Sequence, residues 1–399
     1  MPVQGSDSAR LRPGAALAHR PATARFDRAR ELARAVTEIP QATAANENRL
    51  CRSVAFLAAH AFPRLFLSRA TQQAVRNGTS GASEMLAHGL ISEEAYYRAL
   101  AEDSGAAFIE PETIVAAMSG ETEDGDRIIA RKTSWCRLND GTVRALYAPA
   151  PDHPDIGTDR FRASLKRGPA VAITTPSGLR AALSRQVRRP LGNDACDRLA
   201  TERPRFSAKH GAGAWHGFLA AAASTGFIAG IVTVPSLALL ALHSAVTMFF
   251  LATVTLRLAA AITYRRTPLT PLMRFSNCER PVYSVVVALH REAPVVADLI
   301  GSLKALRWPR SKLEIKLVCE EGDRETRTAL AGQKFDRRFE IVTVPLTGPQ
   351  TKPKALNYAL PFCSGRFVTL YDAEDRPHPD QLEEAWQTFR RSDAKIGAL

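Results

Sequence analysis

The fold of this chain is decided by the stretch TKPKALNYALPFCSGRFVTLYDAEDRP, residues Thr351–Pro377. Within it, Lys354–Leu360 has a short helical pattern that ends at Pro361. The compact apolar run Phe367–Tyr371 then predicts a buried strand. In open α/β sheets, ligands bind beyond the carboxyl ends of the strands, so the residues after this run are the first candidates for a site.

Three acidic residues follow the predicted strand: Asp372, Glu374 and Asp375. Carboxylate oxygens clustered at a strand end suit a hard divalent cation held beside phosphates, which indicates Mg²⁺ or Mn²⁺. The alternative is that these acids cap the next helix, which begins near Asp380. Their position after a buried strand, and after a Lys-x-x-Ala-Leu-Asn element that starts at Lys352, favours a site for a metal-bound diphosphate.

From about Pro281 onward, apolar strands alternate with helical segments. The predicted strands are Val282–Leu289, Leu313–Cys319, Phe339–Val344 and Phe367–Tyr371, and the helices between them are Val295–Leu306 and Arg324–Ala331. This alternation implies right-handed crossovers and a doubly wound, mostly parallel sheet. The carboxyl ends of parallel strands lie at one edge, so the acids that follow them can converge on one nucleotide.

Lys352…Ala355-Leu356-Asn357 and Asp372-Ala373-Glu374-Asp375-Arg376-Pro377 resemble the nucleotide-sugar half of family two (cellulose-synthase-like) glycosyltransferases. The resemblance covers the last third of the chain. It implies an incomplete GT-A half-domain, Rossmann-like with a mostly parallel sheet. It also implies an inverting glycosyltransferase that takes a sugar from a UDP-sugar donor to a polysaccharide or other glycan acceptor.

The resemblance further implies roles for single residues. Donor binding is assigned to Leu289, Glu292, Glu320, Glu321, Lys352 and Asp372, and metal binding to Asp372 and Glu374. Glu stands at positions 320, 321 and 374 where the family has Asp, which changes the reach of each carboxylate by one methylene. For Glu292 the alternative is an acid that favours the dipole at a helix N-terminus.

The acceptor side of the family has no counterpart after Asp375. No Gln-x-x-Arg-Trp segment follows, because Arg307-Trp308 belongs to an earlier loop, and no convincing general base is present. We therefore expect a C-terminally truncated chain that holds the donor half alone, with its catalytic residues unassigned. The competing hypothesis is a non-catalytic membrane adaptor or receptor-like protein with degenerate nucleotide-binding domains.

A long uncharged run precedes this region. His210–Leu256 contains no Asp, Glu, Lys or Arg, and a bilayer helix needs about 20 apolar residues. Two transmembrane helices are predicted within residues 215–262, at Trp215–Val234 and Leu237–Ala260, with a turn at Pro235. The alternative, a buried hairpin of a soluble protein, is disfavoured by so long an uncharged run.

Basic residues flank both spans, with Arg203, Arg205 and Lys209 before them and Arg257, Arg265, Arg266 and Arg274 after. By the positive-inside rule, both soluble parts face the cytoplasm of a bacterial inner membrane. The net charge of +13 comes from scattered arginines without an aromatic-interleaved patch, so we expect lipid and no nucleic acid as partner. Six widely spaced cysteines predict neither disulfides nor zinc.

The N-terminal part divides into a disordered or helical extension (1–58), a small α/β domain (59–190) and a linker (191–214); a second linker spans 263–280, before the half-domain at 281–399. The predicted helices are Ser83–His88, Ser92–Asp103, Arg160–Arg167 and Pro176–Leu183, and the strands are Arg127–Ala130, Thr142–Ala148 and Ala170–Thr174. Glu84–Glu94 resembles the N-terminal domain of type II secretion and pilus-assembly ATPases, some of which bind cyclic di-GMP. Ala82 and Ser83 stand in the region of that motif's missing Arg and Gly, which favours a protein-docking or regulatory module over cyclic di-GMP binding.

Overall fold

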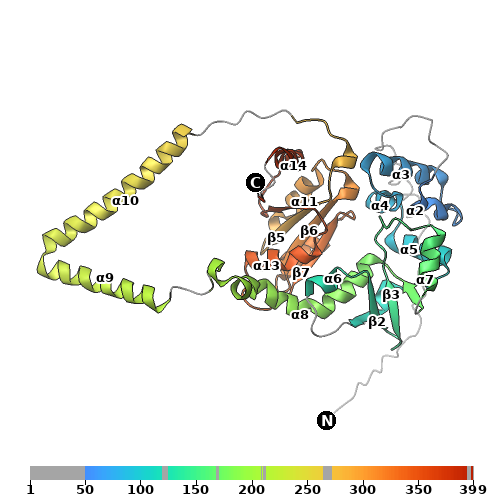
Figure 1. Cartoon of the computed structure of the whole chain (residues 1–399), viewed down its shortest axis with the longest axis horizontal. Coiled ribbons are helices and arrows are strands. Elements are labelled where there is room, and N and C mark those ends of the chain that lie inside the picture. Colours follow the sequence, from blue (N-terminus) through green and yellow to red (C-terminus); the bar gives the residue numbers. More distant parts are fainter. Residues whose placement is uncertain are drawn as a thin grey trace, which may run out of the picture.

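The computed structural model describes residues 50–118, 125–167, 170–207, 209, 213–263, 272–392 and 397–398. Most of the predicted extension, 1–58, lies outside these residues. Figure 1 shows two α/β regions side by side and a pair of long helices that projects away from them.

The C-terminal region is built on a parallel sheet of four strands. These are β5 (Tyr283–Leu289), β6 (Leu313–Glu320), β7 (Phe339–Val344) and β8 (Phe367–Tyr371), in the order β7-β6-β5-β8. All seven residues of β5 are apolar or small and six are buried, as expected for a strand covered on both faces. The predicted α/β fold with a parallel sheet is confirmed.

One face of this sheet is covered by helices of the same region. These are α11 (Val296–Lys304), α12 (Arg324–Ala331) and α14 (Gln381–Arg391). Leu299, Leu330 and Trp386 from these helices share a core with Ile315 and Leu317 of β6. Burial of each such side chain contributes roughly 1.5–3 kcal/mol relative to leaving it exposed.

The opposite face is covered by α13 (Lys352–Ala359) together with a helix of the N-terminal domain, α8 (Pro176–Glu202). Val187 and Leu191 of α8 belong to the same core as Val318 of β6 and Tyr358 of α13. The two α/β regions therefore share one hydrophobic core. Helix α8 runs through Pro190 and far into the predicted linker, well past the expected end at Leu183.

The N-terminal domain sets five shorter helices around a mixed sheet. The helices are α3 (Arg64–Asn77), α4 (Gly81–Ala87), α5 (Glu93–Ser104), α6 (Gly125–Ile129) and α7 (Asp159–Lys166), after a short α2 (Arg52–Ala55). The sheet order is β1 (Ile114–Met118), β2 (Thr133–Leu138), β3 (Val143–Tyr147) and β4 (Val171–Ile173), antiparallel except for β3–β4.

Two predictions for this domain were wrong or incomplete. The strand expected at Arg127–Ala130 lies mostly in α6, because Ile128 and Ile129 both turn into the shared core. Strand β2 was not predicted, because a strand usually has apolar residues facing inward and polar residues facing outward. In β2 the polar Ser134 is buried, whereas the apolar Trp135 is half exposed.

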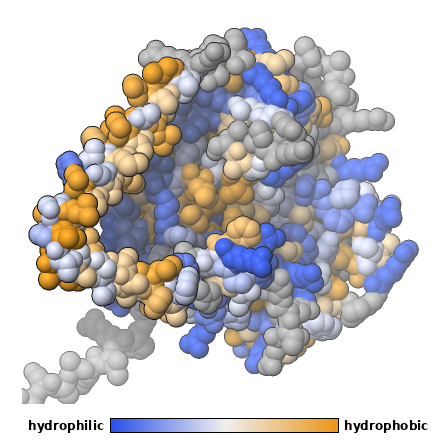
Figure 2. All heavy atoms as spheres, turned by 60° about the vertical axis from the view of Figure 1, so that its left-hand side comes forward, coloured by the Kyte–Doolittle hydropathy of each residue, from blue (hydrophilic) through white to orange (hydrophobic). Residues whose placement is uncertain are grey.

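Two apolar helices, α9 (Ala214–Thr233) and α10 (Pro235–Thr263), match the predicted spans. Both are long and apolar enough to cross a membrane, and neither contains a buried residue. Their hydrophobic side chains line the projecting arm in Figure 2. An exposed apolar surface of this extent is typical of contact with a membrane or with another protein.

Candidate functional site

The acidic residues after β8 form a tight loop. The backbone N–H of Asp372 donates to Oδ2 of Asp375 at 2.7 Å, and the N–H of Asp375 donates to the carbonyl oxygen of Asp372 at 3.1 Å. Asp372, Glu374 and Asp375 are all exposed. Lys352, at the start of α13, forms an ion pair with Asp372. The structure thus brings together the predicted lysine and the predicted acidic loop, which lie 20 residues apart in the chain.

A divalent cation fits this donor set in part. The exposed oxygens of Asp372 and Glu374 are hard ligands, and Mg²⁺ is usually held by one or two carboxylates together with substrate phosphates. Among the described residues, no three His, Cys, Asp or Glu side chains already converge on one point. A cation held by Asp372 and Glu374 would need further oxygen ligands from water or from a bound molecule.

The loop after β5 is fixed by α12. Arg291 has a left-handed backbone with φ of 60°, which costs energy for a residue other than glycine. Its N–H donates to Oδ2 of Asp323 at 2.5 Å, and the N–H of Glu292 donates to Oγ1 of Thr326 at 3.0 Å. Burial alone would raise the pKa of Asp323, but the hydrogen bonds that it accepts from Arg291 and Thr326 outweigh burial and hold that pKa below its usual value.

Two predicted donor residues of this edge differ in exposure. Leu289 is buried in the core, so its side chain supports the loop from beneath. Glu292 is half buried and precedes the short 3-10 helix Ala293–Val295, but its carboxylate makes no capping hydrogen bond. Glu292 thus lies at a helix N-terminus, as the alternative interpretation expected, and the dipole there favours an acid without a capping hydrogen bond.

Glu320, the last residue of β6, is buried rather than open to the strand edge. Only 3% of it is exposed, and its Oε2 lies 3.3 Å from Nζ of Lys354, which is equally buried in α13. Oε1 of Glu320 is buried without a hydrogen-bond partner among the described residues. Burial raises the pKa of Glu320, against the opposing influence of Lys354. Of the two adjacent glutamates at the end of β6, Glu320 is therefore the one that faces the interior.

Glu321 faces the surface and forms an ion pair with a residue of the N-terminal domain. Its Oε1 lies 3.0 Å from Nη2 of Arg188, a residue of α8 in the N-terminal domain. Its backbone N–H donates to the carbonyl oxygen of Val344 at the end of β7. Neither Arg188 nor Lys354 was singled out from the sequence, because both act across elements that the sequence does not place together.

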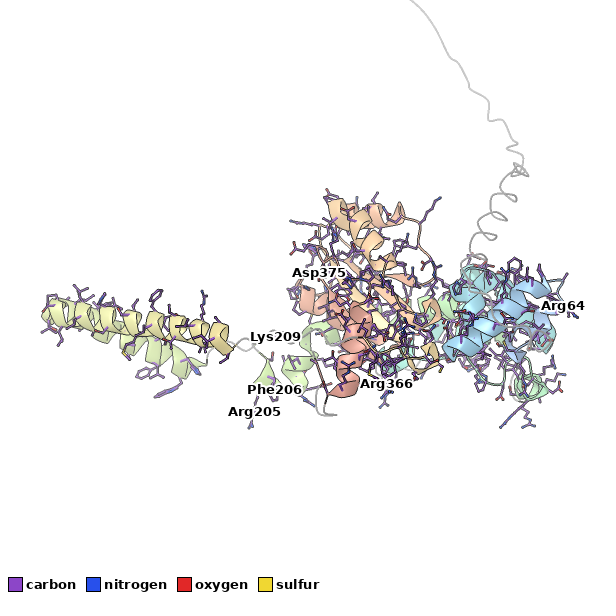
Figure 3. The ribbon with its side chains drawn as sticks, turned by 90° about the horizontal axis from the view of Figure 1, so that it is seen from above. Arg64, Arg205, Phe206, Lys209, Arg366 and Asp375 are labelled. Carbon is purple, nitrogen blue, oxygen red and sulfur yellow. The ribbon has the colours of Figure 1, made fainter. Side chains whose placement is uncertain are left out.

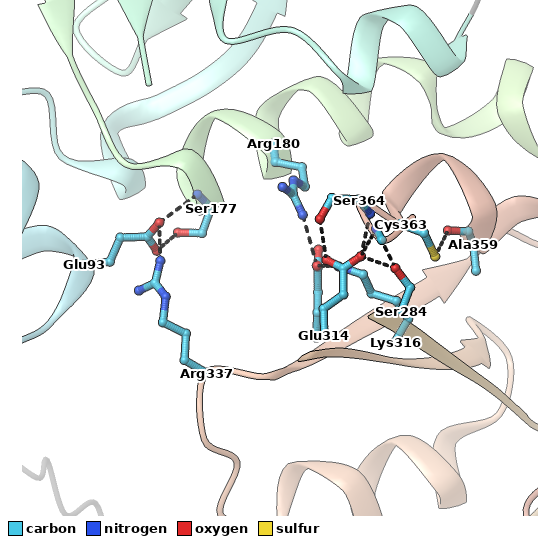
Figure 4. Close-up of polar contacts among 12 residues, drawn as sticks. Glu93, Ser177, Arg180, Ser284, Glu314, Lys316, Arg337, Ala359, Cys363 and Ser364 are labelled. Atoms are coloured by element: carbon cyan, nitrogen blue, oxygen red, sulfur yellow. Dashed lines mark hydrogen bonds and ion pairs between the residues drawn. The ribbon is translucent and has the colours of Figure 1, made fainter. Parts of the chain in front are cut away.

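A second polar cluster lies at the amino ends of the same strands. Lys316 of β6 is 2% exposed and lies 3.2 Å from Oε2 of Glu314 and 2.6 Å from Oε2 of Glu340. Ser284 of β5 donates a hydrogen bond to Glu314 (Figure 4). Arg180 of α8 lies 3.2 Å from Oε2 of Glu340. The sheet thus carries charged residues at both ends, in two different settings.

Known proteins match the C-terminal region. Residues 280–399 match the family model described as "Glycosyltransferase like family 2". A beta-monoglucosyldiacylglycerol synthase of Trichormus variabilis is 26% identical over 121 residues, which cover 30% of this chain and 25% of that protein. A probable glycosyltransferase of Bacillus subtilis is 27% identical over 111 residues, covering 27% and 26%.

A mannosyltransferase of Pyrobaculum calidifontis, solved with GDP-Man and Mn²⁺, aligns at 29% identity and a TM-score of 0.27, over 30% of this chain and 34% of that one. The matched stretch spans about a quarter of the length of the curated relatives. Residues 280–399 are similar to the glycosyltransferase family 2-like domain.

Proposed function

We propose that the C-terminal domain binds a nucleotide-sugar donor, a UDP-sugar, for transfer to a polysaccharide or other glycan acceptor. The observation that carries this proposal is the junction of Lys352 with the loop Asp372–Asp375 at the carboxyl edge of four parallel strands. Ligands of open α/β sheets bind at this edge, and the family match covers the whole of the domain.

Each residue at this edge has a distinct chemical task in the proposal. Asp372 and Glu374 would hold Mg²⁺ or Mn²⁺, whose charge stabilises the departing nucleoside diphosphate. Lys352 would add a second positive charge beside the phosphates once it leaves Asp372. Glu292 and Glu321, at the ends of β5 and β6, would accept hydrogen bonds from the nucleoside. Glu320 and Leu289 would shape these loops from inside.

Inverting transfer also needs a base for the acceptor hydroxyl, and we assign this role to none of the described residues. Asp380, the acid nearest to the loop on the C-terminal side, accepts two hydrogen bonds from Nη1 of Arg307 at 2.9 and 3.0 Å. Both oxygens of this carboxylate are therefore already engaged by Arg307.

We further propose that α9 and α10 anchor the protein in a bacterial inner membrane, with both soluble domains in the cytoplasm. The shared core of α8 and the β5–β8 sheet supports this, because it requires the two domains to lie on one side. Asp375 lies on the side of the C-terminal domain that faces the hairpin (Figure 3). Reporter fusions at Ala150 and Leu399 should both indicate the cytoplasm; a periplasmic signal from either would overturn the topology.

For the N-terminal domain we propose a docking or regulatory role. Its Glu93 pairs with Arg337 at 2.7 Å, and its Glu84 accepts a hydrogen bond from Ser311 at 2.6 Å, so it contacts the C-terminal domain at several points. Cyclic di-GMP binding stays a prediction that titration of the full chain with this nucleotide would test.

Isothermal titration calorimetry of the detergent-solubilised full chain with UDP and Mn²⁺ tests the donor site. Because each variant removes a charged ligand, Asp372→Ala and Glu374→Ala should weaken metal-dependent binding by about 10- to 100-fold. Lys352→Ala should weaken it without abolishing the metal dependence. Glu384→Ala removes an equal charge from an exposed position on α14 and serves as the matched control.

Two outcomes would count against this assignment. Metal-dependent binding that survives both acidic substitutions would place the cation elsewhere. Failure of the unmodified chain to bind UDP, GDP or ADP with Mn²⁺ or Mg²⁺ would favour the alternative of a non-catalytic membrane adaptor.

A further inference from the structure

Helix α8 of the N-terminal domain reaches the proposed donor edge. Nη2 of Arg188 lies 3.0 Å from Oε1 of Glu321, in the first position after β6. The side chains of Arg188 and Glu321 are 34% and 40% exposed, so the pair lies at the surface where a ligand can approach it.

The same helix supports two neighbouring elements of the donor edge. Nδ2 of Asn357, on the helix that carries Lys352, donates to the carbonyl oxygen of Ala195 at 3.1 Å. Gly192 packs so closely on the loop after β7 that an added Cβ would lie 2.3 Å from Oγ1 of Thr347. Over about two turns, α8 therefore holds the end of β6, this loop and α13 together.

The contact with Arg188 restricts Glu321, whose side chain is one methylene longer than the Asp expected at this position. A glutamate has one more rotatable bond than an aspartate, so its carboxylate samples more positions and loses more entropy when a ligand fixes it. An arginine already paired with one oxygen restricts those positions before the ligand arrives. A carboxylate has about four lone-pair positions, so Glu321 can accept a hydrogen bond from a ligand in addition to the pair with Arg188.

We propose that Arg188, a residue of the N-terminal domain, is a positioning residue for the nucleoside half of the donor and acts through Glu321. Its chemical target is a hydrogen-bond donor of the nucleoside, either a ribose hydroxyl or a base N–H. This inference rests on the proposed function, because it presumes that a nucleotide binds beside Glu321. The N-terminal domain thereby contributes to the donor site itself.

The chain offers a closely matched control for this proposal. Arg180 also lies on α8 and pairs with a carboxylate of the C-terminal domain, Glu340, at 3.2 Å. The exposed fractions of that pair, 30% and 36%, are close to those of Arg188 and Glu321. Glu340 lies near the amino end of β7, away from the donor edge. Loss of either arginine weakens the domain contact, but only one faces the donor.

The test is calorimetric titration of the solubilised full chain with UDP and Mn²⁺. Arg188→Ala should raise Kd by about 2- to 10-fold, the effect of freeing one rotamer-rich side chain. Arg180→Ala should leave Kd unchanged. In the Glu321→Ala background, Arg188→Ala should have no further effect, a coupling that a merely structural role would not produce. Arg188→Gln keeps the packing of the stem and replaces the Ala variant if that variant does not fold.

Three results would overturn the inference. Unchanged affinity in both Arg188→Ala and Arg188→Gln would show that the pair does not position Glu321. Equal losses in the Arg180 and Arg188 variants, or additive losses in the double variant, would indicate general loosening of the domain contact. Failure of the unmodified chain to bind UDP would instead overturn the proposed function, and this inference with it.

Discussion

The two ends of strand β6 carry similar residues with opposite consequences. At its amino end, Glu314 and Lys316 belong to a network with Glu340 in which each charge lies within 3.2 Å of an opposite one. At its carboxyl end, Oε1 of Glu320 is buried without a hydrogen-bond partner among the described residues, whereas Glu321 is half-buried and pairs with Arg188 of the N-terminal domain. The amino-end charges are all paired, with Arg180 also bound to Glu340, and the carboxyl end has a carboxylate oxygen without a partner in the described part of the chain.

This difference separates charges that hold the fold from charges that can bind a ligand. A buried ion pair gives little net stability when intact, but removing one partner is costly because it strands the other. An exposed ion pair contributes little either way and exchanges readily with a ligand. Substitutions at the two ends should therefore affect stability and binding in opposite proportions.

Lys316→Ala should produce the largest effect on stability. It removes a buried lysine and leaves the half-buried Glu314 without its counter-ion; loss of one partner of a fully buried pair costs about 3–5 kcal/mol, which is the upper bound here. We expect a clear drop in the midpoint of thermal unfolding of the solubilised chain. UDP binding by the fraction that remains folded should be close to normal, since the donor edge is at the other end of the strand.

The effect of Lys316→Ala on stability should differ most from the effect of removing Lys352, which forms an exposed ion pair at the carboxyl edge of the sheet. Lys352 and Asp372 are 47% and 53% exposed, and such pairs stabilise by about 0–1 kcal/mol. Lys352→Ala should thus leave the unfolding midpoint nearly unchanged although it weakens UDP binding. Equal destabilisation by the two lysine substitutions would contradict the distinction between the two ends.

Local patterns in the sequence were sufficient for the sheet and for most of the donor edge. The apolar runs of β5 to β8 and the acids after Tyr371 are contiguous in the chain, so both their type and their place could be predicted. The part of helix α8 after Leu183 could not be predicted, because Pro190 lies inside it and its later turns are polar, which is typical of a linker.

The features that could not be predicted from the sequence depend on contacts between segments that lie far apart in the chain. Glu93 was expected at the N-terminus of α5, where it lies, but its ion pair with Arg337 spans two domains. Glu320 and Glu321 are adjacent and alike, and only the packing of α13 and α8 shows that one is buried and the other exposed. No pattern within a single segment carries that information.

The smallest predicted effect concerns the titration of two glutamates on β6. Burial alone would raise the pKa of Glu314, but Lys316 and the hydrogen bonds from Ser284 and Ser364 outweigh it and hold the pKa below its ordinary value of 4.5. For Glu320 burial dominates and raises the pKa above 4.5, despite Lys354. The two carboxylates should therefore shift the pH dependence of stability in opposite senses.

The sign follows from proton linkage. With a lowered folded pKa, Glu314 contributes stability above pH 4.5 that is lost as the pH falls through that folded pKa. With a raised folded pKa, Glu320 contributes stability below pH 4.5 that is lost as the pH rises through its own folded pKa. Unfolding midpoints of the native chain, Glu314→Gln and Glu320→Gln, measured from about pH 3.5 to 7.5, isolate both trends. As pH rises, the native chain should gain on the Glu314 variant and lose ground to the Glu320 variant. Trends of the same sign would mean that Lys354 neutralises Glu320 as fully as Lys316 neutralises Glu314, and that the two ends of the strand are electrostatically alike.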